Sequence, residues 1–172
     1  MKIETLEDLF YEELRELYDE EQRLVDALPK MAKNAGSERL RTAFQQHLEQ
    51  TKTHVSRLEE CFSALGRKAD TETADGMKGL VKDGERAIDH IDQSPLRDAA
   101  LITAGKRVEQ YEISAYTDAI SFARLLGHER PARLLEQTLR EEQEAAAMLT
   151  RIGEETVNQE ALQLGAHQTQ RK

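Results

Sequence analysis

Apolar residues recur at alternating steps of three and four positions along four long stretches of the sequence. In the first stretch they are Phe10, Leu14, Leu17, Leu24, Leu28 and Met31. Such steps return a side chain to the same face of an α-helix, whereas a half-buried β-strand alternates at every second residue. Each stretch is therefore predicted to form one amphipathic helix, and such helices bury their apolar faces by packing against one another.

Small residues mark the ends of these helices. Gly36 is predicted to end the first helix as a left-handed cap, and Gly66 and Gly127 to stop two later ones. Ser37 and Ser94 are predicted N-terminal caps. The resulting long helices cover about residues 5–35, 38–65, 95–126 and 130–156, and a shorter helix covers about 76–92.

The connections between the helices predict an all-α, four-helix bundle. A short turn at Gly36–Ser37 makes the first two long helices an antiparallel hairpin, and the last two form a second hairpin. Residues 67–94 link the hairpins and are numerous enough to run the length of the bundle, so the second and third long helices should be parallel neighbours. One long crossover that carries a short extra helix is the topology of ferritin-like folds. Residues 1–157 are predicted to form this bundle, followed by a polar, flexible tail over 158–172.

Composition excludes several classes of function. The chain of 172 residues carries a net charge of −9, which disfavours binding to the phosphates of nucleic acid. No apolar run approaches the length of a membrane span. The N-terminal residues lack the pattern of a signal peptide, and Cys61 is the single cysteine, so we expect a cytoplasmic protein without an internal disulfide.

Six side chains that are able to bind metals occupy positions on the apolar faces. They are Glu21, His47, His54, Glu109, Glu112 and Glu142. All lie in the middle third of their helices, so they are predicted to meet in the bundle interior. Buried carboxylates are costly and repel one another, but two divalent cations would balance four of them. A carboxylate-rich set completed by imidazole suits iron or manganese better than structural zinc.

Alternative assignments remain open at several of these positions. Any single glutamate in so acidic a chain is able to face solvent instead, and Val55 competes with His54 for the same buried face. Glu20, Glu49 and Glu141 flank the inward positions and are expected to be exposed. Each of them replaces its neighbour in the site if the helical phase is shifted by one residue.

Four segments of the chain match a known family. They are LYDEEQRLVDALPKMA, HLEQTKTHVSRLE, LRDAALITAGKRVEQYEISAY and LLEQTLREEQEAAAMLT. In these segments the chain resembles the YciE/YciF family of bacterial stress-associated proteins, which belongs to the ferritin-like superfamily. The resemblance implies a four-helix bundle that is often dimeric, with a di-iron site related to that of rubrerythrins. It implies no established reaction.

The resemblance assigns five of the six residues to the family's site. They are Glu21, His47, Glu109, Glu112 and Glu142. The chain departs from the family pattern at Gln50, where the family often has glutamate, and also at Gln110 and Ala146. An amide cannot bridge two metals as a carboxylate does, so the expected occupancy is one ion or two, with His54 as a substitute ligand.

Two hypotheses for function follow. The first is a ferritin-like stress-associated protein with an iron or manganese site, whose partner in redox chemistry is peroxide or oxygen; whether it is an enzyme stays open. The second is a metal-free acidic bundle that acts by protein association. A homodimer is expected in either case, because the chain has more apolar surface than one bundle core needs. The additional apolar surface is that of Leu9, Phe10, Tyr11 and one side of the crossover helix.

Overall fold

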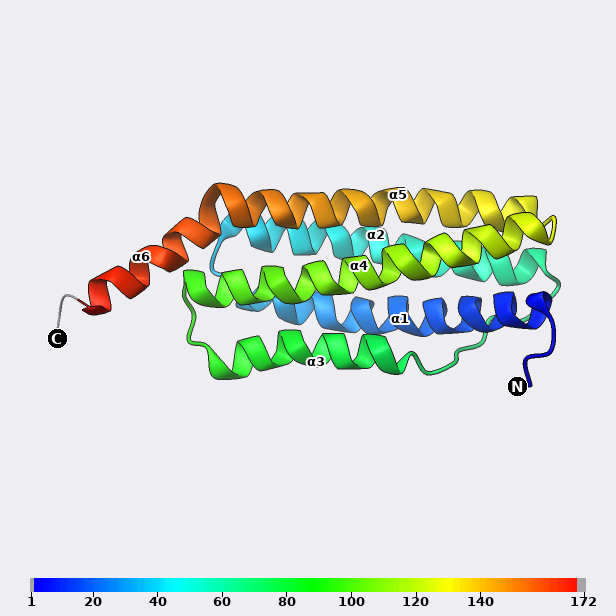
Figure 1. Cartoon of the computed structure of the whole chain (residues 1–172), viewed down its shortest axis with the longest axis horizontal. Coiled ribbons are helices and arrows are strands. Elements are labelled where there is room, and N and C mark those ends of the chain that lie inside the picture. Colours follow the sequence, from blue (N-terminus) through cyan, green and yellow to red (C-terminus); the bar gives the residue numbers. More distant parts are fainter. Residues whose placement is uncertain (1, 170–172) are drawn as a thin grey trace.

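The computed structural model describes residues 2–169, and their side chains as far as residue 164. Four long helices form a bundle, namely α1 (Leu6–Asn34), α2 (Glu38–Ala64), α4 (Pro95–Leu125) and α5 (Glu129–Ile152). The crossover carries α3 (Asp75–His90), and a π-helical turn (Gly153–Val157) leads from α5 into α6 (Asn158–Thr169) (Figure 1). No strand occurs among the described residues. The predicted all-α class and the short extra helix are confirmed.

The helix ends follow the predicted capping residues, with one correction. Ser37 and Ser94 accept hydrogen bonds from backbone N–H groups in the first turns of α2 and α4. Gly66 and Gly127 adopt φ values of 67° and 78°, which favour glycine. Gly36 does not adopt a positive φ, so the prediction of a left-handed cap there is wrong. Its place is set by a close approach instead, because a Cβ atom on Gly36 would lie 3.3 Å from Oδ2 of Asp98.

The crossover places α4 beside α1 rather than beside α2. Helices α2 and α4 run in the same direction, as predicted (Figure 1). Each of them packs against both α1 and α5, so α2 and α4 lie across the diagonal of the bundle and are not neighbours. The reason is that α3 packs on α1 and α4, which brings the chain to α4 along the side of α1.

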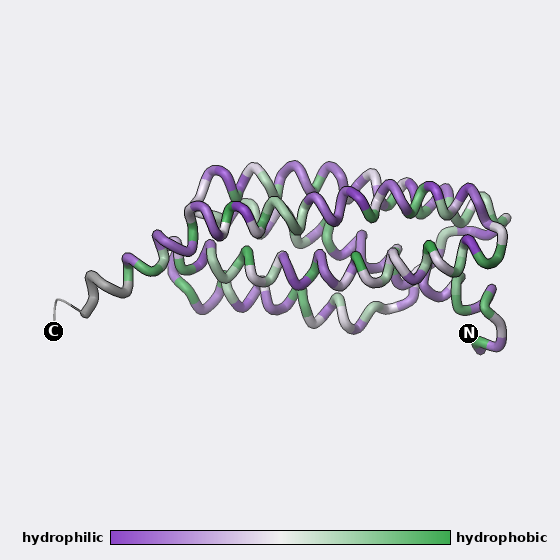
Figure 2. The backbone as a smooth tube through the Cα atoms, turned by 45° about the horizontal axis from the view of Figure 1, so that its top comes forward, coloured by the Kyte–Doolittle hydropathy of each residue, from purple (hydrophilic) through white to green (hydrophobic). Residues whose placement is uncertain are grey.

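Hydrophobic residues form two clusters, one towards each end of the bundle. One contains Leu24, Leu28, Leu40, Phe44, Leu101 and Leu149. The other contains Phe10, Leu14, Leu58, Phe62, Tyr116 and Leu135. Hydrophobic and hydrophilic residues alternate along each long helix, as Figure 2 shows. The core is therefore divided in its middle, where the inward-facing polar residues lie.

The faces expected to mediate dimerisation are covered within one chain. Phe10 is fully buried, Leu9 and Tyr11 are half-buried, and Met77 of α3 packs into the core. These residues therefore give no support to a homodimer, which stays a prediction. No described helix is both long enough and apolar enough to traverse a lipid bilayer.

The expected tail is helical where the structure describes it. Helix α6 covers Asn158–Thr169 and contacts α4, while residues 170–172 lie outside the described residues. Buried Val157 in the π-helical turn holds the start of this extension against the bundle. Flexibility of the tail stays a prediction.

Asp98 ties the first turn of α4 to the turn between α1 and α2. Its carboxylate is buried and accepts hydrogen bonds from the backbone N–H groups of Gly36 at 2.8 Å and Ser37 at 2.7 Å. We expect Asp98→Ala to lower the free energy of unfolding by about 2–4 kcal/mol, because two backbone hydrogen bonds to a buried, charged acceptor are lost. Urea unfolding tests this, with the exposed Asp118→Ala on the same helix as control. Equal losses in the two variants would contradict the capping role.

Candidate metal centre

The structure brings all six predicted site residues together in the middle of the bundle. Two groups have ligand atoms within 4.8 Å of one another. The first group contains His47, Glu109, Glu112 and Glu142, and the second contains Glu21, His54 and Glu142. Glu142 belongs to both groups, so its carboxylate lies between them.

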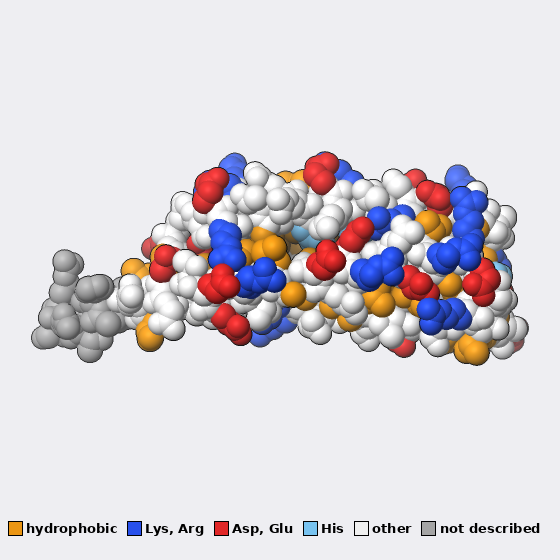
Figure 3. Space-filling model, turned by 90° about the horizontal axis from the view of Figure 1, so that it is seen from above, with side chains coloured by type: hydrophobic (Ala, Val, Ile, Leu, Met, Phe, Trp, Pro, Cys, Tyr) orange, Lys and Arg blue, Asp and Glu red, His pale blue; other side chains and the backbone are white. Residues whose placement is uncertain are grey.

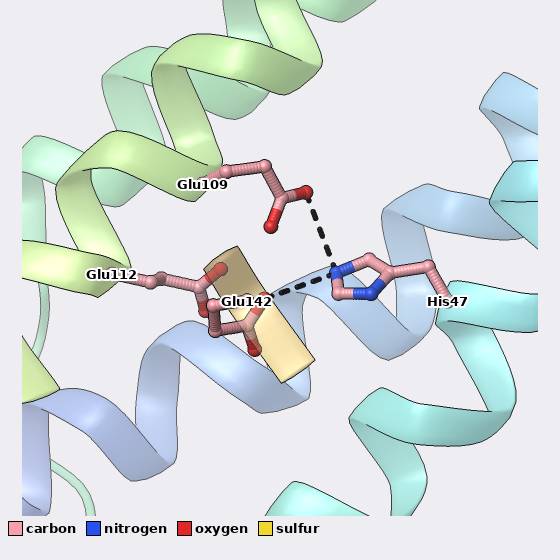
Figure 4. Close-up of side chains that lie close together, drawn as sticks. All are labelled: His47, Glu109, Glu112 and Glu142. Atoms are coloured by element: carbon pink, nitrogen blue, oxygen red, sulfur yellow. Dashed lines mark ion pairs between the residues drawn. The ribbon is translucent and has the colours of Figure 1, made fainter. Parts of the chain in front are cut away.

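Each long helix contributes to this centre through its buried face. Glu109 and Glu112 are three residues apart on α4 and point to the same side, as do His47 and His54, which lie two turns apart on α2. Figure 4 shows the first group, whose four side chains converge on one space. The helical spacing from which these residues were predicted therefore also places them on the buried face of each helix.

In the first group, the contacts are close but lack hydrogen-bond geometry. Nε2 of His47 lies 3.4 Å from Oε1 of Glu109 and 3.5 Å from Oε2 of Glu142. That nitrogen has no hydrogen-bond partner, and neither carboxylate oxygen of Glu112 has one either. Buried polar atoms without partners are rare in folded proteins, so this group requires an explanation.

In the second group, one histidine faces two carboxylates. Nδ1 of His54 lies 2.8 Å from Oε1 of Glu142 and 3.3 Å from Oε1 of Glu21, again without hydrogen-bond alignment. The hydroxyl of Tyr116 donates a hydrogen bond of 2.5 Å to Glu21. Tyr116 thereby fixes the orientation of this carboxylate.

Burial and crowding alter the acidity of these groups. Burial, reinforced by the charges of Glu142 and Glu21, raises the pKa of Glu109 and Glu112 well above the ordinary value. Burial also opposes ionisation of Glu142, but contacts with His54 and His47 hold its pKa below the ordinary value. Without a metal, protons therefore reduce the negative charge of the centre.

Both histidines are held by a partner on their outer side. Nδ1 of His47 lies 3.4 Å from the amide oxygen of Gln50. Nε2 of His54 lies 2.8 Å from Glu141, which in turn accepts hydrogen bonds of 2.7 and 2.9 Å from Arg57. This leaves Nε2 of His47 and Nδ1 of His54 facing the centre. Histidine ligands of metals typically have such an outer partner, which fixes the ring and its tautomer.

The structure corrects the expected exposure of two glutamates. Glu141 is only partly exposed, because it pairs with Arg57 and His54. Glu20 is 1% exposed, although it was expected to face solvent. Because α3 packs on α1 in addition to α2 and α4, the buried arc of α1 is wider than one helical seam. Glu49 is exposed, as predicted.

Each of the two groups has the composition and spacing to hold a metal ion. Metal ions with ligands at about 2.0–2.2 Å bring neighbouring ligand atoms to about 3 Å from one another. The contacts of 2.8 to 3.5 Å around His47 and His54 are of this size. Gln50 belongs to neither group of potential ligands, so its amide does not interrupt the centre. Glu142 occupies the shared position.

Sequence reasoning missed Gln50, Arg57 and Glu141 as supporting residues. Gln50 is one turn beyond His47 and Arg57 is three residues beyond His54, which is the helical spacing of neighbouring side chains. This spacing would have indicated Gln50 as a partner of His47, whereas Glu141, the partner of His54, lies on another helix, 87 residues away in the sequence.

Comparisons with known proteins identify the family. A family model described as a domain of unknown function, DUF892, matches residues 5–162. Protein YciF of Escherichia coli (strain K12) is 35% identical over 162 residues, which cover 94% of this chain and 98% of YciF.

Solved structures agree with the sequence match. The crystal structure of the E. coli stress protein YciF gives a TM-score of 0.87 at 34% identity, covering 91% of this chain and 99% of that chain. YcfI of Rhodopseudomonas palustris, whose description suggests a structural role, gives 0.83 at 36% identity, covering 87% and 95%. A protein of Xanthomonas campestris pv. campestris gives 0.72 at 19% identity, covering 95% and 99%, and supports the fold alone. The resemblance to the YciE/YciF proteins is thus confirmed, and the chain belongs to the DUF892 family.

Proposed function

We propose that the buried centre binds two divalent ions of iron or manganese and that the protein acts in redox defence under stress. The observation that carries the proposal is the set of buried ligand atoms that face one another without hydrogen-bond partners. They belong to Glu21, His47, His54, Glu109, Glu112 and Glu142. Relatedness to the stress protein YciF supports the biological setting.

The residues divide into two ligand sets with a shared carboxylate. His47, Glu109 and Glu112 would hold one ion, Glu21 and His54 would hold the other, and Glu142 would contact both. The bound ions would supply one-electron steps for the reduction of peroxide or oxygen. The chain's own contribution is to orient His47 through Gln50, to orient His54 through Glu141, and to hold a proton between Tyr116 and Glu21.

A metal-free role in protein association is the second candidate. The structural role suggested for YcfI favours it. In that case the carboxylates stay protonated in a buried polar network. In both cases we propose a cytoplasmic homodimer without nucleic-acid or membrane partners. Exposed Leu96 and Leu125 are apolar side chains outside the core that are available for such contacts.

Metal titration separates the two candidates. We expect anaerobic titration with Fe²⁺ or Mn²⁺ to give two ions per chain for the wild-type protein. Glu112→Gln should lose the ion of the first group and keep the other, because an amide replaces a carboxylate in one ligand set only. The control is Glu129→Gln, an exposed position at the start of α5. Equal metal content in wild type and Glu112→Gln, or no binding to either, would leave association as the function.

A further inference from the structure

One side of the metal centre is less deeply buried than the others. Glu21, His54, Glu112 and Glu142 have no exposed surface, whereas His47 is 6% and Glu109 is 3% exposed. Both of these residues line a cavity of about 540 Å³ between α2 and α5. A molecule that approaches the centre through this cavity therefore meets His47 and Glu109 first.

The cavity has apolar walls and an acidic rim. Most of the exposed lining is apolar and comes from Ala43, Phe44, Ala145, Met148 and Leu149, while the neutral polar lining residues are Thr42, Gln45, Gln46 and Gln50. Figure 3 shows this side of the bundle, where hydrophobic side chains and a histidine are visible among charged residues. Glu49 and Glu144 also line the cavity, and none of its described lining residues is lysine or arginine. Anions are therefore disfavoured, and a cation would lose hydration against the apolar walls.

Small residues create the width of the cavity. Ala43 on α2 and Ala145 on α5 both line it. On α4 behind the cavity, a Cβ atom on Gly105 would lie 2.9 Å from Leu149 and 3.6 Å from Phe44, so glycine allows these walls to pack back against α4. The resulting volume exceeds what peroxide or oxygen requires, since one water occupies about 30 Å³ in the liquid. It lies in the range of organic ligands, about 300–1,000 Å³.

We propose that this cavity binds an uncharged organic molecule with an apolar body and one polar group that reaches Glu109 and His47. The molecule would be the substrate, or the organic part of the peroxide substrate, of the centre proposed above, and in that respect the inference rests on the proposed function. Binding itself depends only on the residues that line the cavity, including His47 and Glu109, and not on a bound metal. It is therefore testable on the metal-free chain.

Methionine resonances report on the cavity. In the metal-free full-length chain with 13C-labelled methionine methyl groups, benzyl alcohol should shift the Met148 signal saturably and leave the core residues Met31 and Met77 unchanged. Benzoate and benzylammonium carry the same ring with opposite charges, and each should bind at least about tenfold more weakly than benzyl alcohol. Tighter binding of either ion than of benzyl alcohol would overturn the proposed ligand class.

Two matched variants test the location. Ala145→Leu fills the cavity and should weaken benzyl alcohol binding at least about tenfold. Ala147→Leu, the same change at an exposed position two residues further along α5, should leave binding within about twofold. Equal binding by both variants would overturn the proposal. A second pair of results would also overturn it, namely a Met148 signal that benzyl alcohol does not shift and a Met148→Glu variant that sediments at half the mass of the wild type. A second copy of the chain would then cover this side of the bundle.

Metal titration of Ala145→Leu keeps this proposal separate from the proposed function. The variant should bind as many Mn²⁺ ions as the wild type, because Ala145 belongs to neither ligand group. If benzyl alcohol binds but no metal does, the proposed function fails while the cavity assignment holds. If metal binds but benzyl alcohol does not, the cavity assignment fails alone.

Discussion

Glu142→Gln should remove both metal ions from the protein, a larger effect than that of any other single ligand substitution. Glu142 is the one residue common to both ligand groups, and each of its oxygens lies near a different histidine. Changes in residues that merely support a ligand already cost about 10–100-fold in metal affinity. We therefore expect the loss of the shared carboxylate to lower the affinity for each of the two ions by more than about 100-fold.

Anaerobic calorimetric titration with Fe²⁺ measures this difference directly. Wild type, Glu112→Gln and Glu142→Gln should give two, one and no tightly bound ions. The shared role of Glu142 would be refuted by a Glu142→Gln protein that still binds one ion with wild-type affinity. Far-ultraviolet circular dichroism shows whether each variant retains the helical content of the wild type.

The local order of the helices was predictable because each signal acts within a few residues. Ser37 and Ser94 cap helices through their nearest N–H groups, and Gly127 stops one through its own φ angle. Gly36 is the exception, since its environment includes Asp98 from a helix 62 residues away in sequence. Contacts of that kind leave no mark in local sequence.

The arrangement of the helices was only partly predictable for the same reason. A long crossover dictates that α2 and α4 run in parallel, but the packing of α3 decides on which side of the bundle α4 lies. Glu20 lies on α1, one of the two helices on which α3 packs, and it is buried. The helical period indicates the centre of a buried face, whereas the width of that face depends on how many helices cover it.

The candidate ligands were predictable because polar residues interrupt apolar seams, which is an unusual pattern. The residues that support the histidines were not identified, since Gln50, Arg57 and Glu141 are of types that are common on protein surfaces. Gln50 in particular was interpreted as a weakened ligand. In the structure it supports His47 from outside the centre, and Glu142 takes the shared position instead.

The stability of the metal-free protein should fall as the pH rises, and Glu20 should cause part of that fall. Burial, with the charges of Glu21 and Glu16, raises the pKa of Glu20 from 4.5 to about 8. Between these two values the folded chain retains a proton that the unfolded chain has released. The free energy of unfolding therefore declines with pH by up to about 1.4 kcal/mol per pH unit for this carboxyl group.

Glu20→Gln should make that decline shallower by up to the same about 1.4 kcal/mol per pH unit, because its amide is neutral throughout. Urea unfolding of the metal-free protein at several pH values between 4.5 and about 8 measures the slope. The exposed Glu129→Gln should keep the wild-type slope, and an equal slope in Glu20→Gln would contradict the assignment to Glu20.

Metal loading distinguishes Glu20 from the ligands. Glu109 and Glu112 also have a raised pKa, so they lower stability in the same direction as pH rises. The same holds for His54, whose pKa rises from 6.5 to about 10 because Glu21 and Glu142 outweigh its burial, so its contribution is complete below pH 6.5 and is lost as the pH rises from there to about 10. Bound Mn²⁺ would hold the ligand carboxylates ionised in the folded state and abolish their part of the slope. Glu20 is not a ligand, so its part should persist in the loaded protein and disappear only in Glu20→Gln.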